Sequence, residues 1–212
     1  VFKNVYIQPA ATDSGIPLGA ALYGYHIIGG NKFVPFEFSP LTGKRYSTSE
    51  VEQALSLCRG ARITRPDDYI GATAGLLAAG KICGWFNGRS EYGPRSLGAR
   101  SILADPRDIS IKTRLNTTVK LREGFRPYAP VILEERTGEF FHFKGRSPHM
   151  LMVGDAKPLA KKLMPAVLHR DGTARLQTVS ISDNEQLYML IKRFEEITGL
   201  PALLNTSFKP LY

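Results

Sequence analysis

The segment GRSEYGPRSLGARSILADPR, residues 88–107, constrains the fold of this chain more than any other stretch. It holds four arginines among three glycines, and it follows the apolar stretch 81–86, which we expect to be a buried strand. Glycines let a backbone turn sharply and approach a ligand closely, and Pro94 fixes φ just before Arg95. The pattern therefore predicts a tight loop that presents fixed arginine donors.

The rest of the chain predicts an α/β (α+β) domain. A strand end over 5–8 and a turn over 9–15 come first. Helices are then predicted over 16–28, from the Ser47–Glu50 capping box onward, and over 67–79. A last helix is predicted over 185–198, where Asp183 or Asn184 would cap its start and Gly199 would end it. Strands are predicted over 81–86, 131–133 and 202–204. Strands that alternate with helices favour an α/β or α+β domain, and no internal repeat is visible.

The charge distribution indicates an anionic partner. The 212 residues include 28 Lys or Arg against 19 Asp or Glu, a net charge of +9, and residues 81–130 alone hold ten against four. Nucleic acid, a membrane surface or a phosphorylated small molecule would all suit this balance. The planar guanidinium favours a site that orients a phosphate or carboxylate. The alternative is that these arginines pair with Glu91, Asp105 and Asp108 on a wet surface, where ion pairs contribute little.

Two further basic clusters follow. In KLREGFRPYAP, an extended segment would place Lys120, Arg122 and Arg126 on the same side, where three cations repel unless an anion lies between them. In HRDGTARLQTV, a turn precedes a strand that would carry Arg175 and Gln177 on one face. An ordinary hairpin on a sheet edge is the alternative for the second cluster.

A polar segment, Asn205-Thr-Ser-Phe208, comes directly after the strand predicted over 202–204. Polar residues at the end of a buried strand are a common source of ligand contacts in α/β folds. The run of aromatic residues could stack an adenine, although aromatic residues beside strands are usually core: Trp85, Phe86, Phe140, Phe141 and Phe143.

Composition excludes several classes of protein. The chain is 43% hydrophobic, which is typical of a globular protein, and no apolar run approaches the ~18 residues that a membrane span needs. Cys58 and Cys83 match no metal or disulfide spacing, and the four histidines lack a metal-binding pattern. We expect a cytoplasmic protein, and because the chain begins at Val1 we expect it to be a fragment.

The motifs in residues 88–107, NTTVKLREGFRPYAP, HRDGTARLQTV and NTSF, in this order, resemble the carboxyl-terminal domain of the nodulation-type O-carbamoyltransferases, a family that includes tobramycin and cephamycin carbamoyltransferases. The opening QPAATDSGIPLGAAL resembles the end of that family's amino-terminal domain. The resemblance implies three parts. Residues 1–30 would end a Kae1-like, ATPase-like domain, residues 31–45 would connect, and residues 46–212 would form a YrdC/Sua5-like twisted mixed sheet with flanking helices.

The resemblance also implies an activity. The carboxyl-terminal domain would bind carbamoyl phosphate and ATP, with Mg²⁺, and form carbamoyl adenylate with release of phosphate and pyrophosphate; the amino-terminal domain would move the carbamoyl group to an acceptor alcohol. The motif match assigns catalytic contacts to Lys120, Arg126 and Arg95, and substrate contacts to Arg175, Ser207, Arg100 and Asn205. Asp13 would be one ligand of Fe or another divalent metal in the amino-terminal domain. Small molecules are the implied partners, with no membrane, with nucleic acid disfavoured, and with a homodimer as an assembly that the sequence leaves open.

Two rival functions stay open. The first is a basic, RNA-binding YrdC-like module without carbamoyl chemistry, which strongly salt-dependent binding to generic RNA would favour. The second is an interaction or regulatory domain that keeps the fold and has lost the activity. Against the second, the four cations that the motif match places in the site are all present: Arg95, Lys120, Arg126 and Arg175.

Overall fold

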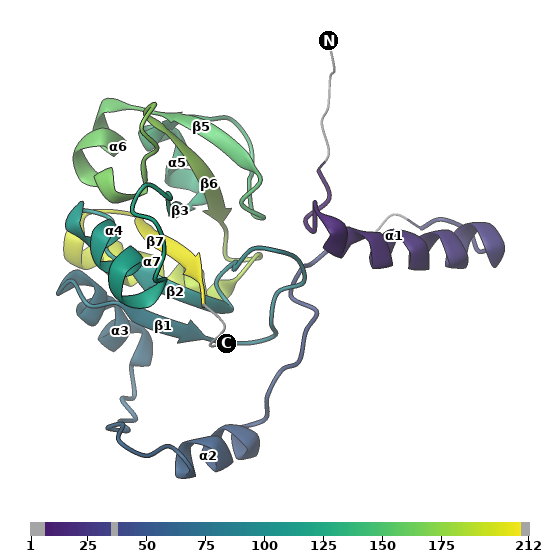
Figure 1. Cartoon of the computed structure of the whole chain (residues 1–212), viewed down its shortest axis with the longest axis horizontal. Helices are drawn as coiled ribbons and strands as arrows, with labels where there is room; N and C mark the ends of the chain where they lie inside the picture. Colours follow the sequence, from purple (N-terminus) through teal and green to yellow (C-terminus); the bar gives the residue numbers. More distant parts are fainter. Residues whose placement is uncertain (1–6, 35–37, 209–212) are drawn as a thin grey trace.

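A computed structural model describes residues 7–34 and 38–208 of the chain, so most of the strand end predicted over 5–8 lies outside the described residues. Seven strands form one mixed sheet in the order β1-β2-β7-β3-β6-β5-β4 (Figure 1). The strands are β1 Cys83–Phe86, β2 Arg100–Ala104, β3 Ala129–Leu133, β4 Phe141–His142, β5 Met152–Ala156, β6 Thr173–Val179 and β7 Ala202–Ser207. Only β3 and β6 pair in parallel among these strands, and the other neighbours are antiparallel.

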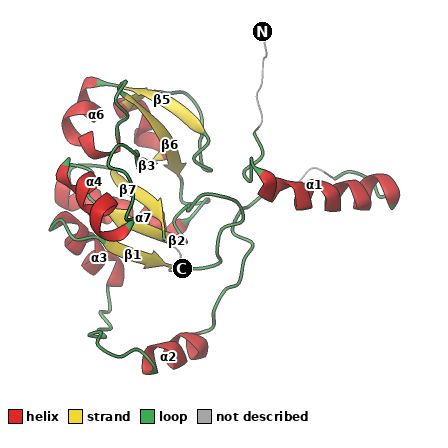
Figure 2. Ribbon diagram, viewed as in Figure 1, coloured by secondary structure: helices red, strands yellow, loops and turns green. Residues whose placement is uncertain are grey.

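Helices flank this sheet (Figure 2), which confirms the predicted mixed α/β architecture. The helices are α1 Ile16–Tyr23, α2 Thr48–Ser56, α3 Tyr69–Ala78, α4 Ser110–Arg114, α5 Thr137–Phe140, α6 Pro158–Leu163 and α7 Glu185–Thr198. Short helical turns are η1 Asp13–Gly15, η2 Gly24–Ile28, η3 Leu115–Val119, η4 Glu134–Arg136 and η5 Pro165–Val167. None of the helices within the described ranges is long and apolar enough to cross a membrane.

The core lies between the central strands and the helices α3 and α7, which make extensive contact with each other. Helix α7 buries an apolar face of Leu187, Leu190, Ile191 and Phe194, each with no exposed surface, at the spacing of one helical stripe. Burying side chains of this size contributes about 1.5–3 kcal/mol each. Phe140 and Phe141 are also fully buried, so these two aromatic residues belong to the core.

Local sequence signals set the helix ends. Of the two caps proposed for α7, Asn184 is the one that accepts the Leu187 N–H, and Gly199 ends the helix at φ 75°. The Ser47–Glu50 capping box opens α2 as predicted. The helix predicted over 67–79 is α3, capped by the Asp68 carboxylate.

The prediction of a buried strand over 81–86 was wrong in one respect. Strand β1 forms there, but only its Trp85 is buried, and Phe86 is 58% exposed. The reason is that β1 lies at the edge of the sheet, where β2 is its one neighbour among the described strands. The shorter stretches 131–133 and 202–204 lie in β3 and β7, whose residues are buried almost throughout.

The alternative considered for residues 169–179, an ordinary hairpin on a sheet edge, does not hold. The turn at Asp171-Gly172 does open β6, but the antiparallel partner of β6 is β5, and helix α6 lies between these two strands in the chain. On its other side β6 pairs with β3, so it is an inner strand and not a sheet edge. The prediction that Arg175 and Gln177 share a face of β6 is compatible with this strand.

The extended segment predicted over residues 120–126 does not form. Lys120 ends the helical turn η3, and Leu121 adopts the left-handed φ of 46°, which reverses the chain. Lys120 is therefore buried at 7% exposure, whereas Arg126 is exposed. Arg122 turns back to donate to Asn116 Oδ1 at 2.8 Å and lies over the ring of Tyr128.

The helix predicted over 16–28 is present as α1 followed by η2, and it stands away from the sheet (Figure 1). None of its residues is buried. Residues 38–46, by contrast, run back to the loop that follows β1: Tyr92 N–H donates to Pro40 O at 2.6 Å and Gly43 N–H to Ser90 O at 3.0 Å. The division of the chain at residues 30 and 45 stays a prediction.

Candidate functional site

The strand order brings the predicted site residues to one end of the sheet. Strand β7 ends where β2 and β3 begin, because Ser101 pairs with Ser207 and Ala129 with Asn205. Strand β6 also begins there, since it runs parallel to β3. The loop 87–99, the loop 120–128 and the end of β7 therefore meet at this end, which we call the site end of the sheet.

The loop 87–99 is organised around the carboxylate of Glu91. One oxygen, Oε1, accepts the backbone N–H groups of Leu97 at 2.7 Å, Ala99 at 2.8 Å and Arg100 at 3.1 Å. The surface ion pair considered for Glu91 is therefore wrong: this carboxylate holds the loop's own backbone. Sequence reasoning missed this role because nothing in the local pattern distinguishes a backbone acceptor from a surface acid.

Two glycines make this loop possible. Gly93 and Gly98 have φ of 110° and 99°, which residues with a Cβ rarely adopt. A Cβ on Gly98 would also lie 2.3 Å from Leu187 Cδ2, and one on Gly93 would lie 3.3 Å from Ala10. The loop is thus packed tightly between helix α7 and the turn that contains Ala10.

A buried polar network attaches the loop to two strands. The amide nitrogen of Asn205 donates to Ser96 O at 3.1 Å and to Gln177 Oε1 at 2.7 Å, and Ser96 Oγ donates to Asn205 Oδ1 at 3.3 Å. Gln177 Nε2 in turn donates to Leu97 O at 3.0 Å. Asn205 and Gln177 are each only 2% exposed. Ser96 is a further residue of this site that the sequence did not single out.

Arg95 and Arg175 come together beside this network. Desolvation by burial, followed by the positive charge of Arg95, lowers the pKa of Arg175. Both Nε atoms are buried without a hydrogen-bond partner among residues 7–34 and 38–208, and the Arg175 guanidinium contacts only the weak acceptor Met150 Sδ, at 3.5 Å. Two neighbouring cations without a described carboxylate partner are a candidate anion site, because an anion would relieve both their repulsion and their unmet donors.

Lys120 and Ser207 also meet, although 87 positions separate them. Lys120 Nζ donates to the backbone oxygen of Ser207 and lies 3.3 Å from Ser207 Oγ. Arg126 lies in the same loop region but is exposed, with Glu123 at 3.9 Å. The structure thus places Lys120 and Ser207 side by side at the end of β7, and Arg126 toward solvent.

Arg100 has a different setting from Arg95. Its guanidinium donates to the carbonyl oxygens of Asn87 at 2.8 Å and Gly88 at 3.2 Å, and it lies 3.6 Å from the ring centre of Phe86. It also reaches Lys44 O at 3.3 Å. These contacts tie the loop 87–99 to β1 and to the preceding segment, so most donors of Arg100 are used within the protein.

The ion-pair alternative holds for one arginine of the motif. Arg107 pairs with Asp105 at 2.6 Å, and the hydrogen bond that it donates to this carboxylate raises the pKa of Arg107. Asp108 instead accepts the N–H of Ser110 at 2.8 Å. Arg89 donates to Gly43 O at 3.1 Å. Of the four arginines in residues 88–107, Arg89 and Arg100 therefore bind backbone carbonyls, Arg107 forms an ion pair, and Arg95 has no described carboxylate partner.

A cavity of about 560 Å³ adjoins the network. The loop residue Leu97, Gln177 of β6, the cap Asn184 and the segment Phe38–Leu41 all contribute to its wall. Small-molecule sites typically have volumes of about 300–1,000 Å³. Leu97 and Gln177 are thus shared by this cavity and the polar network, whereas Arg95 and Arg175 are not among the described residues that line the cavity.

Asp13, the predicted metal ligand, is exposed in η1. Among the residues that the structure describes, no three His, Cys, Asp or Glu side chains gather in a way that could hold a metal ion. The described residues do not by themselves form a site for Fe or another divalent metal.

Comparison with known proteins identifies the family. The family described as Carbamoyltransferase C-terminus matches residues 74–210. Relatives include Nodulation protein NolNO of Sinorhizobium fredii, 44% identical over 98% of this chain and 31% of that protein, and Nodulation protein NolO of Bradyrhizobium diazoefficiens, 41% identical over 98% and 39%. Nodulation protein U of Azorhizobium caulinodans is 35% identical over 100% of this chain and 36% of its own length. The chain thus spans about a third of the length of these relatives.

Among solved structures, full-length HypF in its phosphate- and nucleotide-bound form aligns with 69% of this chain and 18% of that chain, at 16% identity and a TM-score of 0.48. The family is therefore identified from the sequence relatives and the family match, and not from this structural likeness. They cover the loop 87–99, the Lys120 region, β6 and β7, which are the elements that build the site end. The chain belongs to the carbamoyltransferase family, of which it contains the carboxyl-terminal part.

Proposed function

We propose that this chain is the part of an O-carbamoyltransferase that binds carbamoyl phosphate and ATP and forms carbamoyl adenylate. The observation that carries the proposal is the pair Arg95 and Arg175, buried in part and uncompensated by any described carboxylate, in a chain of this family. Carbamoyl phosphate is a small dianion, and two guanidinium groups offer planar donors to its phosphate oxygens.

The proposed chemistry has two balanced steps. Water cleaves carbamoyl phosphate to carbamate and phosphate. A carbamate oxygen then attacks the α-phosphorus of ATP, and the bond to pyrophosphate breaks, which yields carbamoyl adenylate. Negative charge develops on phosphoryl oxygens in both steps, and fixed cations stabilise such charge strongly where water is excluded. Arg95 and Arg175 would hold the phosphate, and Lys120 with Ser207 would contact the reacting phosphoryl group.

Arg126 and Arg100 differ in how well their surroundings support contact with a substrate. Arg126 is exposed and paired loosely with Glu123, so it is free to turn toward a ligand at the site end. Arg100 has most of its donors occupied by backbone carbonyls, which favours a bracing role in the absence of ligand.

The neighbouring cavity supports a place for the nucleoside of ATP. Its volume of about 560 Å³ exceeds the need of a nucleoside, and Leu97, Pro40 and Val179 give it apolar walls. Mg²⁺ bound to the ATP phosphates would supply part of the charge neutralisation. Transfer to an acceptor alcohol is proposed for the part of the relatives that this chain does not span.

The product of the reaction tests this proposal. Purified full chain is incubated with radiolabelled carbamoyl phosphate, ATP and Mg²⁺, and carbamoyl adenylate, phosphate and pyrophosphate are separated and counted. We expect pyrophosphate to appear only when carbamoyl phosphate is present. If none forms and the protein instead binds generic RNA with a steep salt dependence, the RNA-binding module replaces this proposal.

A further inference from the structure

We propose that Asn205 and Gln177 are positioning residues that hold Arg95 beside Arg175, and that neither itself contacts carbamoyl phosphate. The inference rests on the proposed function only in giving Arg95 an anion to bind. It departs from the motif match, which assigns Asn205 to the substrate.

The contacts of Asn205 leave it little to offer a ligand. Both donors of its side-chain amide are used, by Ser96 O and by Gln177 Oε1, and its oxygen accepts from Ser96 Oγ. With 2% exposure, the side chain is also shielded from the site by the loop it holds. Breaking these bonds to reach a ligand would leave buried polar atoms unpaired, at a substantial cost.

Gln177 connects the loop to the strand that carries the other arginine. It lies two residues after Arg175 on β6, so the two side chains share a face of the sheet. Its amide nitrogen donates to Leu97 O, two residues after Arg95. One side chain therefore joins the segments that bear Arg95 and Arg175, and it fixes the spacing between them.

The two arginines need such a clamp because like charges repel. The charge of Arg95 already contributes to the lowered pKa of Arg175. In the absence of an anion, the repulsion would favour any motion that moves the loop 87–99 away from β6. The neutral hydrogen bonds of Asn205 and Gln177 oppose that motion without adding a counter-charge that would compete with the ligand.

Other contacts anchor the rest of the loop, so loss of the clamp should act locally. Leu97 packs with Ala129 and Met150 in a small apolar cluster, and Asn184 Nδ2 donates to Gly98 O at 3.2 Å. The Glu91 carboxylate holds the interior. The variant Gln177→Met keeps the length and burial of the side chain while removing both hydrogen bonds, and it should stay folded.

Amide hydrogen exchange without ligand tests the clamp directly. In the full chain, Gln177→Met should speed exchange of the 97–100 amides about 5- to 30-fold, the effect of losing one or two hydrogen bonds. The matched control is Thr137→Val, which removes the buried bond from Thr137 Oγ1 to Leu133 O at the opposite end of β3 and should leave those amides unchanged. Unchanged exchange in Gln177→Met, or equal acceleration in the control, would overturn the proposal.

Affinity for carbamoyl phosphate separates positioning from direct contact. Gln177→Met should weaken binding about tenfold in the native background, but by less than about twofold in Arg95→Lys, because a flexible lysine depends less on where its backbone lies. Equal losses in both backgrounds would mean that Gln177 touches the ligand, against the proposal. If the native chain binds no carbamoyl phosphate, the proposed function fails, while the exchange experiment still decides whether the clamp exists.

Discussion

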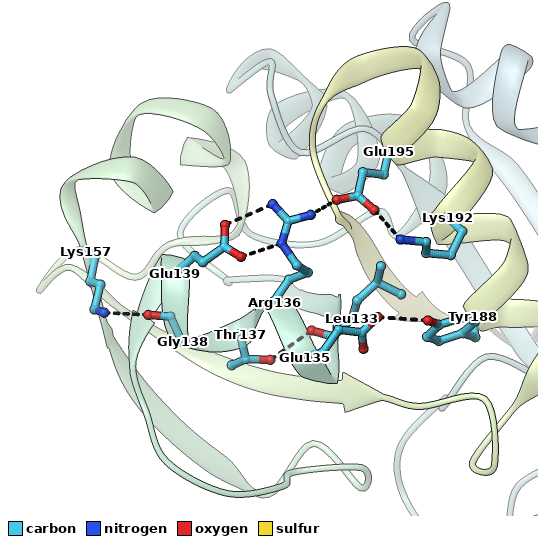
Figure 3. A network of polar contacts seen from close by, with 10 residues as sticks. All are labelled: Leu133, Glu135, Arg136, Thr137, Gly138, Glu139, Lys157, Tyr188, Lys192 and Glu195. Atoms are coloured by element: carbon cyan, nitrogen blue, oxygen red, sulfur yellow. Dashed lines mark hydrogen bonds and ion pairs between the residues drawn. The ribbon is translucent and has the colours of Figure 1, made fainter.

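Arginines at the two ends of the sheet differ in whether a carboxylate lies beside them. At the end where β3 stops, Arg136 is held between Glu139 and Glu195, and Glu195 also pairs with Lys192 at 3.0 Å (Figure 3). At the site end, Arg95 and Arg175 have each other as neighbours and no described carboxylate. Both ends belong to the same sheet and carry the same type of residue. The presence or absence of a neighbouring carboxylate is therefore what distinguishes an arginine used for structure from one that is available to a ligand.

This difference has an energetic meaning. Carboxylates beside Arg136 raise its pKa, whereas burial and a like charge lower the pKa of Arg175. The carboxylates beside Arg136 stabilise the folded chain. The repulsion between Arg95 and Arg175 destabilises it, and a bound anion would remove that destabilisation. Sites that store unfavourable electrostatics in this way are typical of functional regions.

The largest expected effect separates the two ends by ligand affinity. Arg95→Ala should weaken carbamoyl phosphate binding about 100-fold, because charge-assisted hydrogen bonds are lost from the site. Arg136→Ala should leave the affinity within about twofold. Isothermal titration of both variants measures this, and similar losses in both would remove the distinction between the ends.

A smaller effect is expected for the lysines. Lys120→Met should slow pyrophosphate formation at least about tenfold, since the donor next to Ser207 disappears. Lys192→Met, at the Arg136 end, should leave the rate unchanged and serves as the control. A normal rate in Lys120→Met would take Lys120 out of the site.

Stability should respond in the reverse sense. Arg136→Met should lower the free energy of unfolding by about 1–2 kcal/mol, because Glu139 and the largely buried Glu195 lose a partner. Arg175→Met should leave it unchanged or raise it by up to about 1 kcal/mol, since a partly buried, repelled cation is removed. Denaturant titrations measure both values, and a clear destabilisation by Arg175→Met would contradict an uncompensated site.

The smallest effect is a pH dependence confined to the Arg136 end. The hydrogen bond from Arg136 lowers the pKa of Glu139 below its ordinary 4.5. Its stabilisation is therefore present above about pH 4.5 and is lost as the pH falls through the lowered folded-state pKa. Because Glu139 is half exposed, Glu139→Gln should reduce the acid loss of stability by only a few tenths of a kcal/mol, about the size expected for a surface pair. If the free energy of unfolding of Glu139→Gln falls at acidic pH as much as that of the native chain, then groups other than Glu139 cause the acid loss of stability.

Local signals predicted some parts of this molecule well. The caps of α7, the Ser47–Glu50 box and the apolar stretches of β3 and β7 each depend on neighbours in sequence, and each formed where expected. The resemblance also selected residues that the fold gathers at one end, among them Lys120 and Ser207.

What failed depended on contacts between distant segments. The edge position of β1 follows from the strand order, and the left-handed φ of Leu121 comes where the turn η3 ends, and neither feature was visible in the sequence. The roles of Glu91 and Asn205 depend on where backbone N–H and C=O groups of the loop 87–99 end up. Residue type alone could not separate a side chain that holds the loop from one that holds a ligand.

Carbamoyl-phosphate-dependent exchange between ATP and pyrophosphate tests the central claim most directly. The full chain, Arg95→Ala and Arg136→Ala are compared at equal concentration with labelled pyrophosphate. The account predicts exchange in the native chain and in Arg136→Ala, and loss of exchange in Arg95→Ala. Equal exchange in all three, or none in the native chain, would contradict the claim that this chain forms carbamoyl adenylate at the site end and needs Arg95 there to bind the phosphate.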